Sequence, residues 1–246
     1  MGHQSHLLGV TIFDLDTLRT LGQVAVGKKP DAIIYEPLTH RVLTFNGDSE
    51  SATVIDAASG KVVGTLALGG APEFAASDDD GHVFVNLEDK SQVVELDAKS
   101  LQVLGRWSLA PGEEPTGLAI DRAHHRLFIG CHNRRMVIFD TRAHRAVQTL
   151  PIGAGVDATA YDPALRLAFS SNGDGTLTVV STQPVSVLQN VETMPGARTM
   201  ALDPETHRVY LVSALMTSNP TPEERKQGKR PRYAPDTFII LVVSPR

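Results

Sequence analysis

Short runs of hydrophobic residues alternate with turn-forming residues along almost the whole chain. Runs of this length that are rich in Val, Ile, Leu and Thr are typical of β-strands. No window carries a sustained apolar stripe at helical spacing, so we expect almost no helix. In the first complete unit, turns rich in Gly, Asn, Asp and Pro separate four such runs, at 32–35, 41–45, 52–55 and 61–66.

The four-strand unit is repeated along the chain. Similar residues open each unit about every 42 residues, at Pro30, Pro72, Pro115, Val156 and Ala197. Four strands in about 40–50 residues are the signature of a propeller blade. One such sheet cannot bury both of its faces alone, whereas sheets stacked face to face bury them. A parallel β-helix is the rival fold, but its rungs are shorter than this repeat. The pattern therefore predicts an all-β protein, a β-propeller of four-stranded antiparallel blades.

The repeat extends over the whole chain, which we expect to be a single propeller domain, 1–246. The segment 10–26 resembles only the last two strands of a blade. We therefore favour a chain that is truncated at its N-terminus relative to a seven-bladed ring, with a closed ring of six units as the alternative. An open arc would expose strand edges and promote self-association. The expected partial blade is 7–26, the complete blades are 27–68, 69–110, 111–152, 153–191 and 192–246, and a long loop is inserted at 214–235.

The units resemble the YVTN-type repeat of YncE-like seven-bladed propellers. That repeat reads Asp-Pro-x-Thr-x-Arg-Val-Tyr-Val, and here it is matched by Asp-Pro-Glu-Thr-His-Arg-Val-Tyr-Leu at 203–211. The Val-Ile-Asp run at 54–56 and the Lys-Val-Val-Gly run at 61–64 match its later part. The resemblance implies an extracytoplasmic protein, periplasmic or secreted. The first residues of the chain have neither the basic nor the apolar region of a signal peptide.

Composition and charge exclude several classes of partner. The net charge of −5 gives no electrostatic reason to expect nucleic acid or anionic lipid. No stretch approaches the ~18 apolar residues that a bilayer span needs. The single cysteine, Cys131, cannot form an internal disulfide bond.

Alternation of strand direction sorts the loops onto two faces. The connections from the fourth strand of one unit to the first strand of the next share a face with the second-to-third-strand loops. The former carry charged residues at nearly the same register, Asp31, Glu73, Glu114, Asp157 and Arg198. The latter carry amides and an imidazole, Asn46, Asn86, His132, Asn133 and Asn172. These residues are our candidate ligand-binding set.

Such a set of oxygen atoms could hold Ca²⁺ or another divalent cation, a cationic or hydroxyl-rich small molecule, or a protein. In any single loop, Asn and Asp are also ordinary turn residues. His132 follows Cys131, and the pair could form a soft-metal or acid–base site or simply pack in the loop. The other histidines that we place in loops, His40, His82, His125 and His207, lie on the opposite face and are interpreted as turn residues.

No catalytic motif is present in the sequence. We therefore expect a non-catalytic ligand- or protein-binding scaffold. The alternative is a divalent-metal-dependent lactonase, with Glu73, Asn86, Asp157 and Asn172 as metal ligands at the channel mouth. A redox-partner propeller is a weaker third option, because the chain has no haem-attachment motif. The basic loop 214–235 is either a lid over the acidic face or disordered.

Overall fold

The computed structural model describes residues 9–221, 223–224 and 227–245. Its regular structure is almost entirely β-strand, with two short 3₁₀ turns, η1 (Gly47–Ser49) and η2 (Glu88–Lys90). Four complete sheets follow one another along the chain, each with its strands in sequence order and antiparallel. Their strands are β3 (Pro30–Glu36), β4 (Arg41–Asn46), β5 (Ser51–Asp56) and β6 (Lys61–Ala67); β7 (Pro72–Ser77), β8 (His82–Leu87), β9 (Gln92–Asp97) and β10 (Gln102–Ser108); β11 (Pro115–Asp121), β12 (Arg126–Cys131), β13 (Arg135–Asp140) and β14 (Arg145–Pro151); and β15 (Val156–Asp162), β16 (Leu167–Asn172), β17 (Thr176–Thr182) and β18 (Val185–Glu192).

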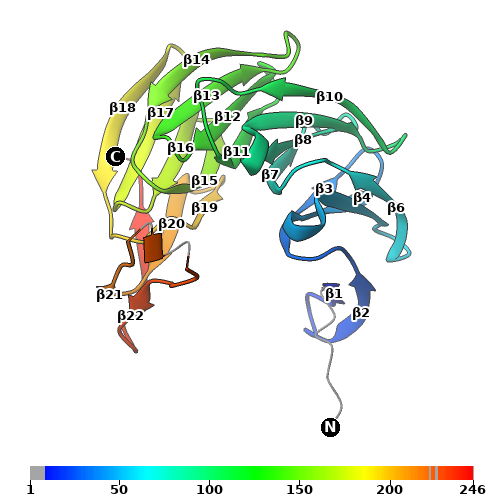
Figure 1. The fold of residues 1–246 in the computed structure, drawn as a ribbon, viewed down its shortest axis with the longest axis horizontal. Helices are drawn as coiled ribbons and strands as arrows, with labels where there is room; N and C mark the ends of the chain where they lie inside the picture. Colours follow the sequence, from blue (N-terminus) through cyan, green and yellow to red (C-terminus); the bar gives the residue numbers. More distant parts are fainter. Residues whose placement is uncertain (1–8, 222, 225–226, 246) are drawn as a thin grey trace.

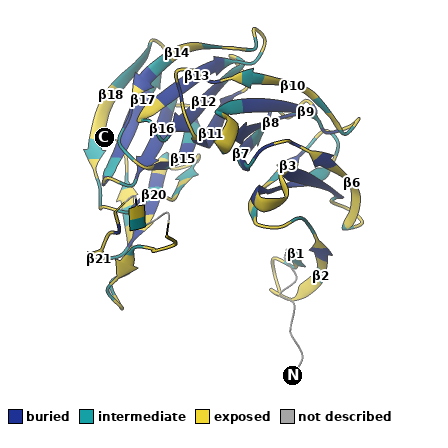
Figure 2. Ribbon diagram, viewed as in Figure 1, coloured by how far each residue is buried: buried dark blue, intermediate teal, exposed yellow. Residues whose placement is uncertain are grey.

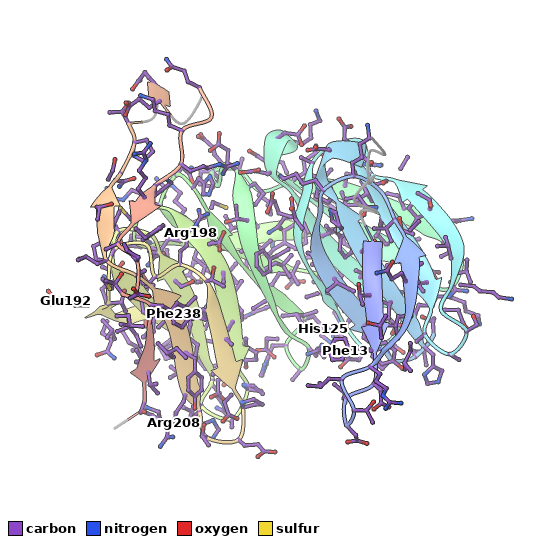
Figure 3. All side chains as sticks on the ribbon, turned by 90° about the horizontal axis from the view of Figure 1, so that it is seen from below. Phe13, His125, Glu192, Arg198, Arg208 and Phe238 are labelled. Atoms are coloured by element: carbon purple, nitrogen blue, oxygen red, sulfur yellow. The ribbon has the colours of Figure 1, made fainter. Side chains whose placement is uncertain are left out.

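Smaller sheets flank these four. A hairpin of β1 (Gly9–Phe13) and β2 (Thr20–Ala25) precedes them, and a three-stranded sheet of β19 (Met200–Asp203), β20 (Arg208–Ser213) and β23 (Ile239–Val243) follows. The expected long loop at 214–235 contains the short pair β21 (Met216–Ser218) and β22 (Arg232–Tyr233). This hairpin projects from the end of the last sheet (Figure 3).

The sheets stand side by side around a common axis, as the blades of a propeller do (Figure 1). The first strands of successive sheets, from β3 through β7, β11 and β15 to β19, contact one another and line the inside of the arc. The fourth strands lie outermost. In Figure 1 the arc is open between the β1–β2 hairpin and the last sheet. The predicted fold class, a β-propeller of four-stranded antiparallel blades, is confirmed.

The hydrophobic core lies between neighbouring sheets rather than within any one of them. In Figure 2 the buried residues lie mainly in the middle strands of the sheets. Val83 and Val85 of β8 pack against the preceding sheet, whereas Phe84 packs against the following one. In β12, Ile129 packs against the preceding sheet and Phe128 against the following one. Because successive side chains of a strand point to opposite faces, the second and third strands are apolar almost throughout. Face-to-face stacking of the repeats explains this pattern.

The aspartates that end the third strands cap the following turns. Asp56 accepts a 2.8 Å hydrogen bond from the Ser59 amide, and Asp97 accepts one of 2.9 Å from the Ser100 amide. These hydrogen bonds lower the pKa of both carboxyl groups, in Asp56 chiefly through the Ser59 hydroxyl. Asp140 makes the equivalent contacts. Local turn chemistry therefore accounts for these acids.

Most of the histidines on the opposite face are turn residues, as the sequence indicates. His40, His125 and His207 have φ angles of 54°, 54° and 58°, in the left-handed region. His82 lies one residue further along, as the first residue of β8. The His207 ring also contacts the preceding blade, with Nδ1 lying 2.7 Å from Oδ2 of the buried Asp162.

Candidate functional site

Two kinds of loop meet at the end of the molecule opposite the histidine turns. In each complete blade, the first residue after the second strand donates its amide hydrogen to a carbonyl just before the first strand. The four bonds measure 2.8–3.1 Å and join Gly47 to Lys29, Glu88 to Ala71, His132 to Glu114 and Gly173 to Gly155. The two loop types therefore form one surface, as strand alternation predicts. Arg198 lies at this end of the protein, and His125 lies at the other (Figure 3).

A β-bulge near the start of each inner strand positions the candidate acids. The pairing register shifts just after the first residue of β3, β7, β11 and β15. Bulges re-aim side chains and are frequent next to functional sites. The first bulged residue is an acid in three of the four blades and a threonine in the other, at Asp31, Glu73, Asp157 and Thr116.

Glu114 is not the equivalent of these acids, so its predicted register was wrong. Its carbonyl makes the bond that Lys29 and Gly155 make in other blades, which places it two residues before the bulge. Like those two residues it has a positive φ, here 50°. Its side chain is 66% exposed. Thr116 occupies the bulge instead, and its hydroxyl donates to the Val156 carbonyl of the next blade at 3.2 Å.

The electrostatics of Glu73 show that the acids act on one another. Burial, followed by the negative charges of Glu88, Asp31 and Asp157, raises the pKa of Glu73 to about 7, against an opposing effect of Lys29. A carboxyl group shifts upward in this way when water is removed from it and like charges surround it. We call the set Asp31, Glu73, Glu88 and Asp157 the acidic mouth.

Lys29 places an ammonium group at the edge of the acidic mouth. Its Nζ lies 2.9 Å from Asp31 Oδ2. This hydrogen bond raises the pKa of Lys29, and the charges of Asp31, Glu73 and Asp48 act in the same direction against partial burial. The mouth therefore already stabilises one cation, which the chain itself supplies.

Asp157 has two neighbours from the last blade. The Thr199 hydroxyl donates to its Oδ2 at 3.3 Å, and Arg198 Nη1 lies 4.0 Å from its Oδ1. The Ser171 hydroxyl donates to the Arg198 carbonyl, which anchors the loop. Arg198 thus partly compensates Asp157, at a distance too long for a strong ion pair.

His132 and Cys131 do not form a joint site. His132 Nδ1 lies 3.4 Å from Glu114 Oε2 and 3.7 Å from Glu88 Oε1, beside the acidic mouth. Cys131 is fully buried in the core, and burial raises the pKa of its thiol to about 12. Asn133 has a structural contact, because its Nδ2 donates to the Pro111 carbonyl at 2.7 Å.

Asn46 and Asn172 are buried inside their own blades. Each amide nitrogen donates to two hydroxyls of the third strand at 3.0–3.2 Å. Each amide oxygen accepts a hydroxyl, from Thr44 in one case and Ser170 in the other. These side chains therefore hold the second and third strands together and are not free to bind a ligand.

Asn86 was expected to be equivalent to Asn46 and Asn172, but it lies one register position earlier. Leu87, opposite Gln92, occupies the equivalent position. A shift of one residue turns a strand side chain to the other face of its sheet. Asn86 Nδ2 accordingly donates to the Thr116 and Gly117 carbonyls of the next blade, at 3.0 and 3.3 Å.

The proposed metal ligands fit poorly together. Asn86 and Asn172 are fully buried, and the amide nitrogen of each is hydrogen-bonded within or between blades. Across the part of the chain that the structure describes, no group of three or more His, Cys, Asp or Glu side chains is placed to hold a metal ion. Divalent cation binding stays a prediction, and Glu73 and Asp157 are the members of the set that belong to the acidic mouth.

Two members of this surface were missing from the candidate set. Glu88 follows the second strand directly, at the same position as Gly47, His132 and Gly173. Lys29 occupies in its blade the position that Glu114 has in another, because the carbonyl of each accepts the amide hydrogen of the residue after the second strand. Alignment of the repeats by the second strand, rather than by the opening Pro, would have found both.

The chain was compared with known proteins. No protein-family model and no curated protein sequence matches it. Many solved structures share its fold. Hydrazine synthase of Kuenenia stuttgartiensis is similar with a TM-score of 0.72 and 15% sequence identity, over 91% of this chain and 66% of that one. The present chain thus spans slightly less than two thirds of that chain's length. At 15% identity the likeness to hydrazine synthase concerns the fold alone, and with the repeated four-stranded sheets it supports a β-propeller.

No helix in the described ranges is long and apolar enough to span a membrane.

Proposed function

We propose that this chain is a non-catalytic β-propeller scaffold that binds a cationic group of a small molecule or protein at the acidic mouth. The raised pKa of Glu73, about 7, carries this proposal. This shift means that the surroundings of Glu73 offer too little positive charge and water to stabilise its ionised carboxylate. A protonated amine or guanidinium would stabilise the ionised carboxylate and so bind favourably.

The contact of Lys29 supports the same chemistry. An ammonium group lies 2.9 Å from Asp31, in the field of Glu73 and Asp48. A second cation placed nearer Glu73, Glu88 and Asp157 would meet carboxylates that Lys29 does not contact at hydrogen-bonding distance. Rigid blades hold the bulge residues in place, which favours pre-organised recognition.

Binding is favoured over metal-dependent hydrolysis because of the asparagines. A lactonase site would need the amides of Asn86 and Asn172 as metal ligands, and both side chains are buried and hydrogen-bonded. The acidic mouth keeps carboxylates that can bind a cation without them.

Calorimetric titration tests the proposal, with spermidine and argininamide as cationic probes and glycerol as a neutral one. We expect the cationic probes to bind, more tightly at about pH 8 than at about pH 5, because Glu73 is then ionised. Glu73→Gln should weaken binding, whereas Glu113→Gln, which removes an exposed carboxylate from a neighbouring loop, should not.

Two results would contradict this function. Equal heats for glycerol and the cations would show that charge is not recognised. Tight binding of Ca²⁺ or Mg²⁺, reversed by EDTA and accompanied by hydrolysis of simple lactones, would establish the lactonase instead.

The YVTN-type repeat supports a further part of the proposal, namely that the protein acts outside the cytoplasm as YncE-like propellers do. Fractionation of cells that express the native gene tests this location. Recovery in the cytoplasmic fraction alone would refute it.

A further inference from the structure

A groove of about 470 Å³ crosses the junction between the third and fourth complete blades. Arg126, Val147 and Gln148 line it from the third blade, and the turn 182–185 lines it from the fourth. Both blades have four strands and a neighbouring sheet on either side. Arg126 directly follows His125, which lies at the end of the molecule that carries the histidine turns (Figure 3). The groove is therefore a second surface feature, at the other end of the blades from the acidic mouth.

Arg126 is the charged side chain that lines this groove. It is half-buried at the start of β12, and within the described ranges it makes neither a hydrogen bond nor an ion pair. Asp140 lies opposite it in the β12–β13 pairing. The Asp140 carboxylate is directed at its own turn, however, where Oδ1 accepts the amide hydrogens of Arg142 and Ala143 at 2.9 and 2.8 Å. The planar guanidinium of Arg126 thus keeps its N–H donors for a ligand.

The equivalent arginine of the first complete blade shows which contact Arg126 lacks. Arg41 is the first residue of β4, as Arg126 is of β12, and its Nη1 donates to two backbone carbonyls in the turn after β9 of the next blade. In the fourth blade, strand pairing runs one residue further into the corresponding turn, to Thr182 opposite Val185. This turn therefore has a different shape, and among the described contacts its carbonyls receive no hydrogen bond from Arg126.

Two glutamine side chains flank the groove. Gln183 Oε1 accepts a 2.9 Å hydrogen bond from Arg166 Nη1, and Gln183 Nε2 lies 2.7 Å from His124 Nε2, so this side chain is held at both of its polar atoms. Gln148 Nε2 donates to the Val185 carbonyl at 3.2 Å. Because an amide nitrogen carries two hydrogens, Gln148 has a second one to offer to a ligand.

Apolar side chains form the rest of the lining. Ile138 is fully buried, Val147 is 44% exposed, and Pro184 lies on the side of the fourth blade. Ligand sites commonly combine an apolar lining with a few placed polar groups. The groove therefore suits a molecule that has one anionic end and a small apolar body.

The turns around the groove add positive charge. Arg142 and Arg145 lie exposed just after β13. Asp121, the buried acid at the end of β11, is already engaged, because its Oδ2 lies 2.8 Å from His124 Nδ1 and accepts a 3.0 Å hydrogen bond from the Tyr161 hydroxyl. An anion that approaches this end of the two blades is therefore attracted to it.

We propose that the groove binds the carboxylate group of a small amphipathic molecule, with Arg126 as the residue that holds the anion. A guanidinium and a carboxylate are both planar and form two parallel hydrogen bonds. One unpaired guanidinium matches one monoanion, and the apolar body of the ligand would pack on Val147 and Pro184. The site is independent of the cation binding proposed for the acidic mouth.

Proton–nitrogen NMR of the arginine Nε–Hε groups tests the proposal on the whole chain. Benzoate is the probe, benzamide is its neutral match in shape, and acetate lacks the apolar body. We expect benzoate to shift the Arg126 signal with a dissociation constant of about 1 mM, while the Arg142 signal stays unchanged. Benzamide and acetate should each bind at least about ten-fold more weakly, because one lacks the charge and the other lacks the apolar contact.

Two variants separate the groove from the general positive charge of this end. Arg126→Gln should weaken benzoate binding by at least about ten-fold, as followed by the Gln183 amide signal. The melting temperature should not change, because in the described structure Arg126 has no partner to lose. Arg142→Gln removes an exposed arginine from a neighbouring turn and should change benzoate binding by less than about two-fold, since salt screens its charge.

Three results would overturn the proposal. Equal binding of benzoate and benzamide would show that the carboxylate is not recognised. An equal loss of binding in Arg126→Gln and Arg142→Gln would show that only the overall charge of this end matters. Inorganic phosphate that binds as tightly as benzoate would show that any anion suffices and that the apolar lining has no part.

Discussion

Removal of the Glu73 charge should stabilise the protein at high pH and have little effect at low pH. The native carboxyl group has a pKa of about 7, against an ordinary value of 4.5. Between these values the native state binds more protons than the unfolded state, so stability falls as pH rises through this window. The full difference corresponds to about 3 kcal/mol. Because Glu73 is only partly buried, solvent screening reduces this to about 1–2 kcal/mol.

Urea unfolding followed by circular dichroism measures this effect in the wild type and in Glu73→Gln, at about pH 5 and about pH 8. The variant should exceed the wild type by about 1–2 kcal/mol at the higher pH and by little at the lower. Glu113→Gln serves as the control and should track the wild type at both values. A destabilised Glu73→Gln at about pH 8 would refute the reasoning, because it would show that the ionised carboxylate contributes a favourable contact.

Further substitutions test the packing and hydrogen bonds between and within blades. Phe128→Ala should cost about 3–5 kcal/mol of unfolding free energy, because the ring is fully buried between two sheets; a loss under about 1 kcal/mol would argue against that packing. Asn172→Ala should cost about 1–3 kcal/mol in urea unfolding, since buried hydroxyls lose their partner, and an unchanged midpoint would contradict this. His207→Ala leaves the buried Asp162 without its cross-blade contact and should lower the melting temperature, with His207→Gln restoring part of the loss.

The repeat made the architecture predictable. Hydrophobic runs at 32–35 and 41–45 identified β3 and β4 to within two residues, because strand period and turn chemistry are local properties. The acids at the bulges, Asp31 and Glu73, were found in the same way, since each follows the Pro that opens a unit. These features need no knowledge of contacts between blades.

Side-chain direction could not be read from the loops. Asn86 and Asn46 stand in similar Asn-containing segments, yet one residue of register turns them to opposite faces of their sheets. Glu114 also lies beside the Pro that opens its unit, but it precedes that Pro, and Thr116, two residues later, takes the bulge position. Only the pairing between strands fixes such positions.

The central claim is that bulge residues from different blades converge into one mouth of poorly compensated negative charge. Carbon-detected NMR titration of the Glu73 side-chain carboxyl tests it most directly. We expect a midpoint near 7, which moves down when argininamide is present, because a bound cation stabilises the carboxylate. A midpoint near the ordinary value of 4.5 that argininamide does not change would contradict it.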